Sequence, residues 1–455
     1  MTAVNAINQS AGAAALAGVD RRATRKTILA AALGNGLEFF DFTVFSFFAA
    51  VIGELFFPVG SQAGALMLSL ATFGVGFIVR PLGSIVIGAY ADRAGRKPAL
   101  VLTVSMMALG TGIIGLAPTY ASIGLVAPLL IVVGRLLQGF SAGGEVGAAT
   151  TLLMEAGGAG RRGSLVSWQM ASQGGAALAG ALVAATLSRG LSHEALLAWG
   201  WRVPFLIGLL IGPVGFYLRR HLDDTLPAAQ LAVVKPGADG AAGTAGAAAA
   251  QRQVKPRSRM PLRQIVAGTM LVIGGTSTMY TIVFFLPSFL TLTTGMPAAV
   301  SLLAGCTAGL VLLVGSPFAG RLADRVPRRK SLLYPVSIAS LVVLLPAFHA
   351  IRVWPSIYTV ALVVFLLVGL MTLSSPTGFV LILESLRPEV RATSLGVIYA
   401  LGVTIFGGFA QLIVSGLWRL TGSFYAPAWY VLACGFVSLG GLLLFKEADP
   451  VVALD

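Results

Sequence analysis

Long hydrophobic runs separated by short polar breaks follow one another along the whole chain of 455 residues. Each run continues for about 18 residues or more, the length that an α-helix needs to cross the hydrocarbon core of a bilayer. The strands of a transmembrane β-barrel would instead alternate in hydrophobicity over segments of about ten residues. The pattern therefore predicts twelve membrane-spanning helices, near residues 27–50, 65–90, 98–117, 123–154, 164–187, 202–219, 262–290, 298–319, 331–350, 356–383, 393–416 and 427–445.

The composition supports this interpretation. Hydrophobic residues make up 56% of the chain and charged residues only 11%, whereas soluble domains carry about 25% charged residues. Twelve spans of about 20 residues would accommodate nearly all of the apolar side chains. We therefore predict an all-α membrane protein and exclude a soluble fold.

A polar segment rich in Ala and Gly, residues 221–260, divides the twelve runs into two sets of six. Its composition is typical of a flexible linker. We expect a tail at residues 1–26, six-helix halves at 27–220 and 261–446, this linker between them, and a second tail at 447–455. The halves also repeat, because GAYADRAGRK at residues 88–97 is echoed by GRLADRVPRR at residues 320–329. A parallel repeat with a substrate site between the halves is one known plan for transporters.

The net charge of +14 reflects topology. Of the 31 Lys and Arg residues, 25 lie in segments that the pattern places in the cytoplasm, and four lie outside. By the positive-inside rule, both termini are then cytoplasmic. The order of the N-terminal residues, Ala-rich and then basic, is the reverse of a secretory signal, so we expect this segment to be retained. The basic clusters form no helix face suited to phosphates, so we expect no nucleic-acid partner.

Motifs for catalysis and metal binding are missing from the sequence. It contains no HExxH, GxSxG or phosphate-binding loop, and its three His residues are not at metal-ligand spacing. Cys306 and Cys434 lie inside apolar runs and suggest no redox site. We therefore expect neither an enzyme nor a bound metal or organic cofactor, and we expect a multi-pass monomer in the lipid bilayer of the plasma membrane, the inner membrane of a bacterium.

Two motifs in register resemble those of the major facilitator superfamily. These are the loop at 88–97 with its second copy, and RLLQGFSAGGE at residues 135–145 in the fourth span. A resemblance to the metabolite:H⁺ symporter family is carried by the segments at 34–42, 80–83, 201–205 and 406–408. Within that family, the sequence is most similar to citrate and tricarballylate symporters around residues 88–90, 139–144 and 267–280. The resemblance implies twelve helices in two halves and the import of a small organic anion with the proton as coupling ion.

Charged residues within the predicted spans are few, and each is expensive in a bilayer, so each is a candidate for function. They are Glu38 and Asp41 in the first span, Arg80 in the second, and Arg135 and Glu145 in the fourth. Glu38 follows Lys26 by twelve residues and Arg80 precedes Asp92 by twelve, so both should lie about 18 Å from the cytoplasmic ends of their helices. Glu38 and Arg80 can therefore meet, and Asp41 with Arg135 is the second candidate pair.

Polar stripes mark the helix faces that would border a water-filled cavity, since polar groups facing lipid would lack partners. On this basis we predict a substrate site formed by Asn35, Arg80, Arg135, Gln138, Gln169, Gln173 and Tyr280. Three buried carboxylates against two guanidinium groups leave one surplus negative charge, which a bound proton would relieve. We therefore predict Asp41, Glu38 and Glu145 as proton-coupling residues.

In relatives that carry sugars, an aspartate of the first helix pairs with an arginine of the fourth. By this resemblance, we expect that protonation of Asp41 frees Arg135 to bind a substrate carboxylate through two hydrogen bonds. Structural roles remain open for these residues. Glu38 with Arg80 could simply lock two helices, Arg135 could extend toward the outer interface, and Glu145 could serve helix packing beside Gly139.

Charged residues near the cytoplasmic helix ends are expected to form salt bridges that hold the outward-facing state and so control conformational populations. They are Asp92, Arg93, Arg96, Glu155, Asp324, Arg328 and Glu384. Two other functions stay open at this point. The first is a proton symporter for an osmolyte such as proline or betaine, and the second is a polyspecific drug exporter.

Overall fold

The computed structural model describes residues 21–94, 96–143, 145–156, 160–209, 262–387, 390–445 and 447. The predicted linker at 221–260 lies outside these ranges. Four residues lie inside them, but their side chains are not described: Asp92, Arg93, Arg96 and Glu145. The described chain is helical without strands, and helices lie in all twelve predicted runs. The prediction of an all-helical fold is confirmed.

The first half of the chain contains α2 (Arg21–Phe47), α3 (Ala49–Phe56), α4 (Gln62–Ile78), α5 (Arg80–Ala94), α6 (Arg96–Leu116), α7 (Tyr120–Ile123), α8 (Val126–Ala142), α9 (Glu145–Glu155), α10 (Arg162–Gly190), α11 (His193–Ala195), η1 (Leu196–Gly200) and a helix at 202–209, of which α11 and η1 lie between two predicted runs. The last six runs contain α13 (Leu262–Thr278), η2 (Met279–Phe285), α14 (Leu286–Thr294), α15 (Ala298–Arg325), α16 (Arg329–Val353), α17 (Ile357–Glu384), α18 (Arg391–Val403), η3 (Thr404–Gly408), α19 (Ala410–Thr421) and α20 (Ala426–Leu444). We refer to residues 21–209 and 262–445 as the N-terminal and C-terminal halves.

Several predicted spans are interrupted. The first is bent by 64° between the segments Ala32–Phe47 and Ala49–Phe56. The seventh and eleventh pass through the π-helical turns η2 and η3, which widen the helix locally and often occur at functional sites. Such irregular backbone is tolerated at membrane depth where protein surrounds it, and the side chains of η2 are all buried.

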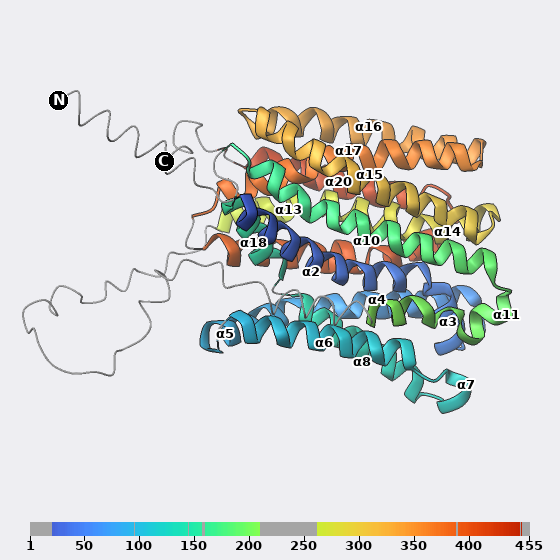
Figure 1. Ribbon diagram of the computed structural model, residues 1–455. Coiled ribbons are helices and arrows are strands. Elements are labelled where there is room, and N and C mark those ends of the chain that lie inside the picture. The colour runs from blue at the N-terminus through green and yellow to red at the C-terminus, as the bar shows by residue number, and fades with distance from the viewer. Residues whose placement is uncertain are drawn as a thin grey trace, which may run out of the picture.

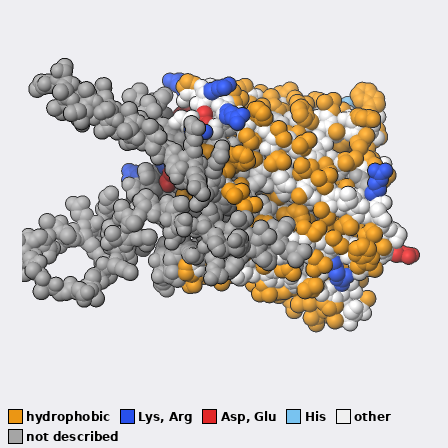
Figure 2. Space-filling model, viewed as in Figure 1, with side chains coloured by type: hydrophobic (Ala, Val, Ile, Leu, Met, Phe, Trp, Pro, Cys, Tyr) orange, Lys and Arg blue, Asp and Glu red, His pale blue; other side chains and the backbone are white. Residues whose placement is uncertain are grey.

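The helices run side by side as a bundle, and the described part contains eight that are long and apolar enough to cross a membrane, or nine with the bent pair (Figure 1). On the visible face, hydrophobic side chains cover the flanks of the bundle, and the charged side chains lie toward its two ends (Figure 2). Large hydrophobic side chains such as Leu109, Val342 and Phe365 are more than half exposed. An apolar belt between charged ends fits a lipid environment.

A close seam joins the halves where α10 packs antiparallel to α15. A methyl group on Gly163 would lie 2.6 Å from the carbonyl oxygen of Gly320, and one on Gly309 would lie 2.4 Å from the amide nitrogen of Leu178. At the far end, a methyl on Gly305 would lie 3.2 Å from the β-carbon of Ala181. Small residues therefore let the two backbones approach closely between Gly163 and Ala181 of α10.

Helices of the second and fourth spans meet in the same way inside the N-terminal half. A β-carbon on Gly139 would lie 1.7 Å from the carbonyl oxygen of Gly76, and one on Gly143 would lie 2.0 Å from that of Arg80. Glycine is required at both positions because any side chain would collide with backbone atoms. This contact fixes the depth of Arg80 relative to the polar residues of α8.

Candidate functional site

Glu38 and Arg80 form a buried ion pair inside the N-terminal half. The Arg80 Nη2 atom lies 3.2 Å from the Glu38 Oε1 atom, and the two side chains are 3% and 2% exposed. The guanidinium carbon lies 4.0 Å from the ring centroid of Phe77 and 4.6 Å from that of Phe42. The structure therefore brings together the two residues that their equal depth places opposite each other.

Asp41 lies one turn further along α2 in a network of neutral donors. Its Oδ2 atom accepts hydrogen bonds from the Thr111 hydroxyl and, at 3.3 Å, from the Gln138 amide nitrogen. The amide oxygen of Gln138 accepts from Nη1 of Arg135 at 2.9 Å. The expected direct pairing of Asp41 with Arg135 is thus wrong in this conformation, because Gln138 stands between the carboxylate and the guanidinium group.

Arg135 is fully buried and surrounded by aromatic rings. Its guanidinium carbon lies 4.5 to 4.8 Å from the ring centroids of Phe42, Phe45 and Phe73. Cation–π contacts of this kind stabilise a guanidinium group away from water. Arg135 therefore does not extend to the outer interface, and in this conformation it does not face a cavity between the halves.

Asn35 and Gln169 hold α2 against α10. The Asn35 amide nitrogen donates to the Gln169 carbonyl oxygen at 2.9 Å and to the Ser172 hydroxyl at 2.7 Å, and the Gln169 amide nitrogen donates to the Asn35 side-chain oxygen at 2.8 Å. These predicted substrate residues are occupied with each other. The structure gives both of them a helix-locking contact.

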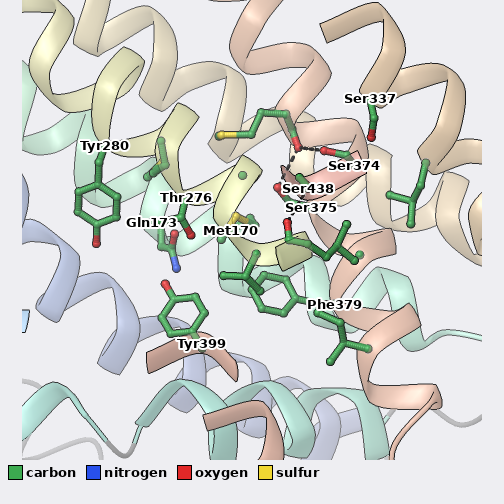
Figure 3. A pocket seen from close by; sticks show the side chains of 18 of the residues that line it. Met170, Gln173, Thr276, Tyr280, Ser337, Ser374, Ser375, Phe379, Tyr399 and Ser438 are labelled. Atoms are coloured by element: carbon green, nitrogen blue, oxygen red, sulfur yellow. Dashed lines mark hydrogen bonds between the residues drawn. The ribbon is translucent and has the colours of Figure 1, made fainter. Parts of the chain in front are cut away.

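A central cavity of about 100 Å³ lies between the halves, large enough for several water molecules. Of the predicted substrate residues, Gln173 and Tyr280 line it, whereas Asn35, Arg80, Arg135, Gln138 and Gln169 do not. The described residues that line it include no charged side chain. The rest of its polar wall comes from the C-terminal half (Figure 3). Thr276 lies on the polar stripe of the seventh span that was expected to border a cavity, whereas five further residues were not predicted: Ser337, Ser374, Ser375, Tyr399 and Ser438.

A second, smaller pocket of about 40 Å³ lies inside the N-terminal half. It is lined by Glu38 and Asp41 together with Thr103, Thr111 and Ser141. Gly208 closes one wall, and a β-carbon there would lie 2.6 Å from the Asp41 Oδ1 atom. The two carboxylates therefore border this pocket, while Phe39 of the same helix borders the central cavity.

Aromatic rings separate Arg135 from the central cavity. The ring centroid of Tyr280, at the cavity wall, lies 6.1 Å from that of Phe73 and 5.5 Å from that of Phe77. Phe73 also contacts Arg135, and Phe77 contacts Arg80. Aromatic rings thus stand between Arg135 and the cavity, whereas Arg80 interacts with Tyr280 of the cavity wall itself.

Charged contacts join the halves at the ends of α10 and α15. Asp324 accepts hydrogen bonds from the backbone nitrogens of Gly163 and Ser164, at 2.6 and 2.9 Å, and thereby caps the N-terminus of α10. Glu384 pairs with Arg162 of the other half at 3.1 Å.

Two further predicted gating residues differ in their surroundings. Glu155 lies 3.7 Å from Arg391. Arg328 is exposed, and the neighbouring Arg329 is the residue that contacts Glu384, at 3.3 Å. The predicted roles of Asp92, Arg93, Arg96 and Glu145 lie outside the described side chains.

The chain matches the family model described as Major Facilitator Superfamily over residues 31–410. It belongs to that superfamily. Citrate-proton symporters of Salmonella typhi and Klebsiella pneumoniae are 35% and 36% identical to it, over 95% and 91% of this chain and 97% and 90% of theirs. A putative proline/betaine transporter of Staphylococcus haemolyticus is 32% identical over 92% of this chain and 87% of its own length.

Among solved structures, the crystal structure of a D-xylose-proton symporter superimposes with a TM-score of 0.72, covering 94% of this chain and 98% of its own. At 18% identity this likeness shows the fold alone. The twelve-helix fold expected from the hydrophobic runs is that of the superfamily. Members of this family are multi-pass membrane transporters and not enzymes.

Proposed function

We propose that this chain is a proton-coupled symporter that imports a small organic anion, a di- or tricarboxylate such as citrate, by alternating access. It would act as a monomer in the bacterial inner membrane with both termini in the cytoplasm. The observation that carries the proposal is the environment of Asp41. Neutral donors, Thr111 and Gln138, hold this buried carboxylate, so it can gain a proton without breaking an ion pair.

Charge explains how the proton and the anion would be coupled. Among the described buried side chains, Glu38 and Asp41 balance Arg80 and Arg135 when both carboxylates are ionised. Protonation of Asp41 leaves one net positive charge behind the aromatic layer at Tyr280. That charge attracts an anion in the central cavity, because the low polarity of the surroundings screens it only weakly. Long-range attraction replaces the direct bond from Arg135 that the sequence suggested.

Contacts between the halves lie on both sides of the central cavity and would open alternately. On the cytoplasmic side, these are the bonds of Asp324 to α10 and the Glu384 pair with Arg162. On the outer side, the Ser46 hydroxyl bonds the Gln411 side chain at 3.0 Å. The structure thus resembles a state in which the solute is enclosed, and loss of either set of contacts would open one side.

Two other transport functions are less well supported. The proline/betaine transporter is a more distant relative than the two citrate-proton symporters. The wall of the central cavity combines apolar residues with Gln173, two tyrosines and several serines, so the argument against a drug exporter is the similarity to the citrate-proton symporters. That similarity favours a carboxylate.

Uptake by the purified protein in proteoliposomes tests the proposal. We expect labelled citrate to accumulate when the outside is made acidic, and we expect the accumulation to collapse when a protonophore abolishes the pH gradient. Proline and betaine, tested in the same vesicles, should not accumulate. Citrate flux that is indifferent to the gradient, or accumulation of betaine in its place, would refute the assignment.

A further inference from the structure

The central cavity offers hydrogen-bond donors at the end formed by Gln173, Tyr280 and Tyr399, which lie around one side of it in Figure 3. The Gln173 side chain is 1% exposed and interacts with the Tyr399 hydroxyl, but its amide nitrogen reaches no acceptor among the described residues with ordinary hydrogen-bond geometry. An amide nitrogen can only donate, and a tyrosine hydroxyl can donate as well. A carboxylate, which only accepts, would satisfy this end.

The opposite end is formed by serines of the C-terminal half (Figure 3). Ser374 and Ser375 both donate to the carbonyl oxygen of Met371, at 2.9 and 2.8 Å, and Ser438 donates to that of Leu271 at 3.0 Å. A carbonyl oxygen cannot donate in return, so each of these hydroxyl hydrogens is already engaged. The serine oxygens have only lone pairs left to offer to the cavity.

This polarity limits what the serine end can hold. A second ionised carboxylate placed against Ser374, Ser375 and Ser438 would face three oxygens whose hydrogens are engaged, and no charged side chain of the described wall would compensate it. A group that donates a hydrogen bond would instead be satisfied by Ser375 or Ser438. Sites built to bond a substrate hydroxyl reject analogues that lack it, because the buried polar atoms are then left unpaired.

We propose that the serine end, formed by Ser374, Ser375 and Ser438, binds a hydroxyl group of the substrate, so that the transporter selects hydroxycarboxylates over carboxylates of the same skeleton without a hydroxyl. The proposal rests on the carboxylate symport proposed above and specifies its substrate class. The carboxylate binds at the Gln173 end, and the hydroxyl donates to the serine oxygens. Specificity therefore depends on helices α17 and α20 of the C-terminal half.

Competition between two anions tests this inference. Citrate and propane-1,2,3-tricarboxylate share their carbon skeleton and three carboxyl groups and differ in the central hydroxyl. In proteoliposomes with an acidic exterior, we measure inhibition of labelled citrate uptake by each unlabelled anion. We expect citrate to compete roughly 10- to 100-fold better than the analogue, the cost of one buried acceptor left unsatisfied.

Serine-to-alanine variants locate the discrimination. Ser375→Ala and Ser438→Ala should each weaken the preference for citrate over propane-1,2,3-tricarboxylate by about tenfold, measured as the ratio of the two inhibition constants. Ser340→Ala is the matched control, because the Ser340 hydroxyl also bonds a helix carbonyl, that of Val336, but does not line the cavity. Thermal unfolding of each purified variant shows whether it is folded, and the two single variants test the same end independently.

Each outcome separates the two proposals. Equal competition by both anions in the wild type, or an unchanged preference in both folded serine variants, would overturn the hydroxyl-binding role and leave carboxylate symport intact. A rise in competition by the analogue relative to unlabelled citrate as the pH falls would show that a protonated carboxyl group occupies the serine end, which also overturns it. Absence of any carboxylate flux would overturn both.

Discussion

Replacing Asp41 by Asn tests whether this carboxylate carries the coupling proton. The asparagine side-chain oxygen can still accept the hydrogen bonds from Thr111 and Gln138, so the network survives while the titratable charge is removed. The variant is therefore a permanent mimic of the protonated state. We expect Asp41→Asn to retain exchange of citrate across the membrane and to lose accumulation driven by a pH gradient.

The size of the effect follows from the aromatic layer. The Arg135 guanidinium carbon lies 4.8 Å from the Phe73 ring, which lies 6.1 Å from the Tyr280 ring at the cavity wall. Asp41 lies behind Arg135, beyond Gln138, so the charge that changes is at least on the order of 10 Å from a bound anion, and with an effective dielectric constant of about 20 it changes the binding free energy by at most about 1.7 kcal/mol. That upper limit corresponds to roughly a 15-fold change in Kd.

The sign of this electrostatic effect predicts how the affinity for citrate depends on pH. Protonated Asp41 leaves a net positive cluster and tight anion binding, so wild-type affinity for citrate should fall by up to that factor as pH rises and the carboxyl group ionises. In Asp41→Asn the affinity should stay high and independent of pH. Binding is measured by calorimetry on purified protein across a pH series, with citrate corrected for its own ionisation.

A matched control changes a carboxylate that has no such environment. Glu54 of α3 is 45% exposed and lies 3.7 Å from His193. Glu54→Gln should leave both exchange and accumulation unchanged. Wild-type accumulation by folded Asp41→Asn would refute the reasoning, and so would a pH-independent affinity of the wild type.

Three further variants test packing, gating and the proton network. Gly139→Ala should destabilise the protein by about 1–3 kcal/mol or prevent folding, measured as a lower Tm, whereas Gly369→Ala, whose β-carbon would meet open space, should not. Glu384→Gln removes a charge that pairs with two arginines, so it should increase labelling of an engineered cavity cysteine from the cytoplasmic side. Glu155→Gln breaks a longer and more exposed contact and should increase the labelling less. Equal labelling of the two variants would contradict this ranking. Thr111→Val should lower gradient-driven uptake about tenfold and Thr111→Ser should preserve it; equal uptake by both would remove the hydroxyl from the coupling network.

The sequence was sufficient to predict the helices and one of the buried ion pairs. The hydrophobic runs predicted the helices because span length is imposed by the bilayer, and equal depth brought Glu38 opposite Arg80. The bridge through Gln138 could not be predicted, because which side chain stands between Asp41 and Arg135 depends on rotamers and on the close approach at Gly139.

The serines that line the central cavity were the largest group of site residues that the sequence did not predict. Many helical serines bond a carbonyl one turn back, so sequence alone does not distinguish Ser340, which lies away from the cavity, from Ser375, which lines it. The sequence pointed to Arg328 as a gating residue, but the structure shows the next residue, Arg329, in contact with Glu384. The two positions differ by one residue at the start of a helix. Helix ends vary by that much, and no hydrophobic pattern resolves them.

The glycine-lined contact between α10 and α15 has a consequence for leakage. It extends from Gly163 to Ala181, which at 1.5 Å per residue is about 27 Å, nearly the hydrocarbon thickness of a bilayer. A bound polar solute therefore cannot pass laterally between these two helices into the lipid, and lipid acyl chains cannot enter the cavity between them. Enlarging one of these glycines would open a crevice that ions could follow, so an uncoupled proton leak is the expected signature of damage there.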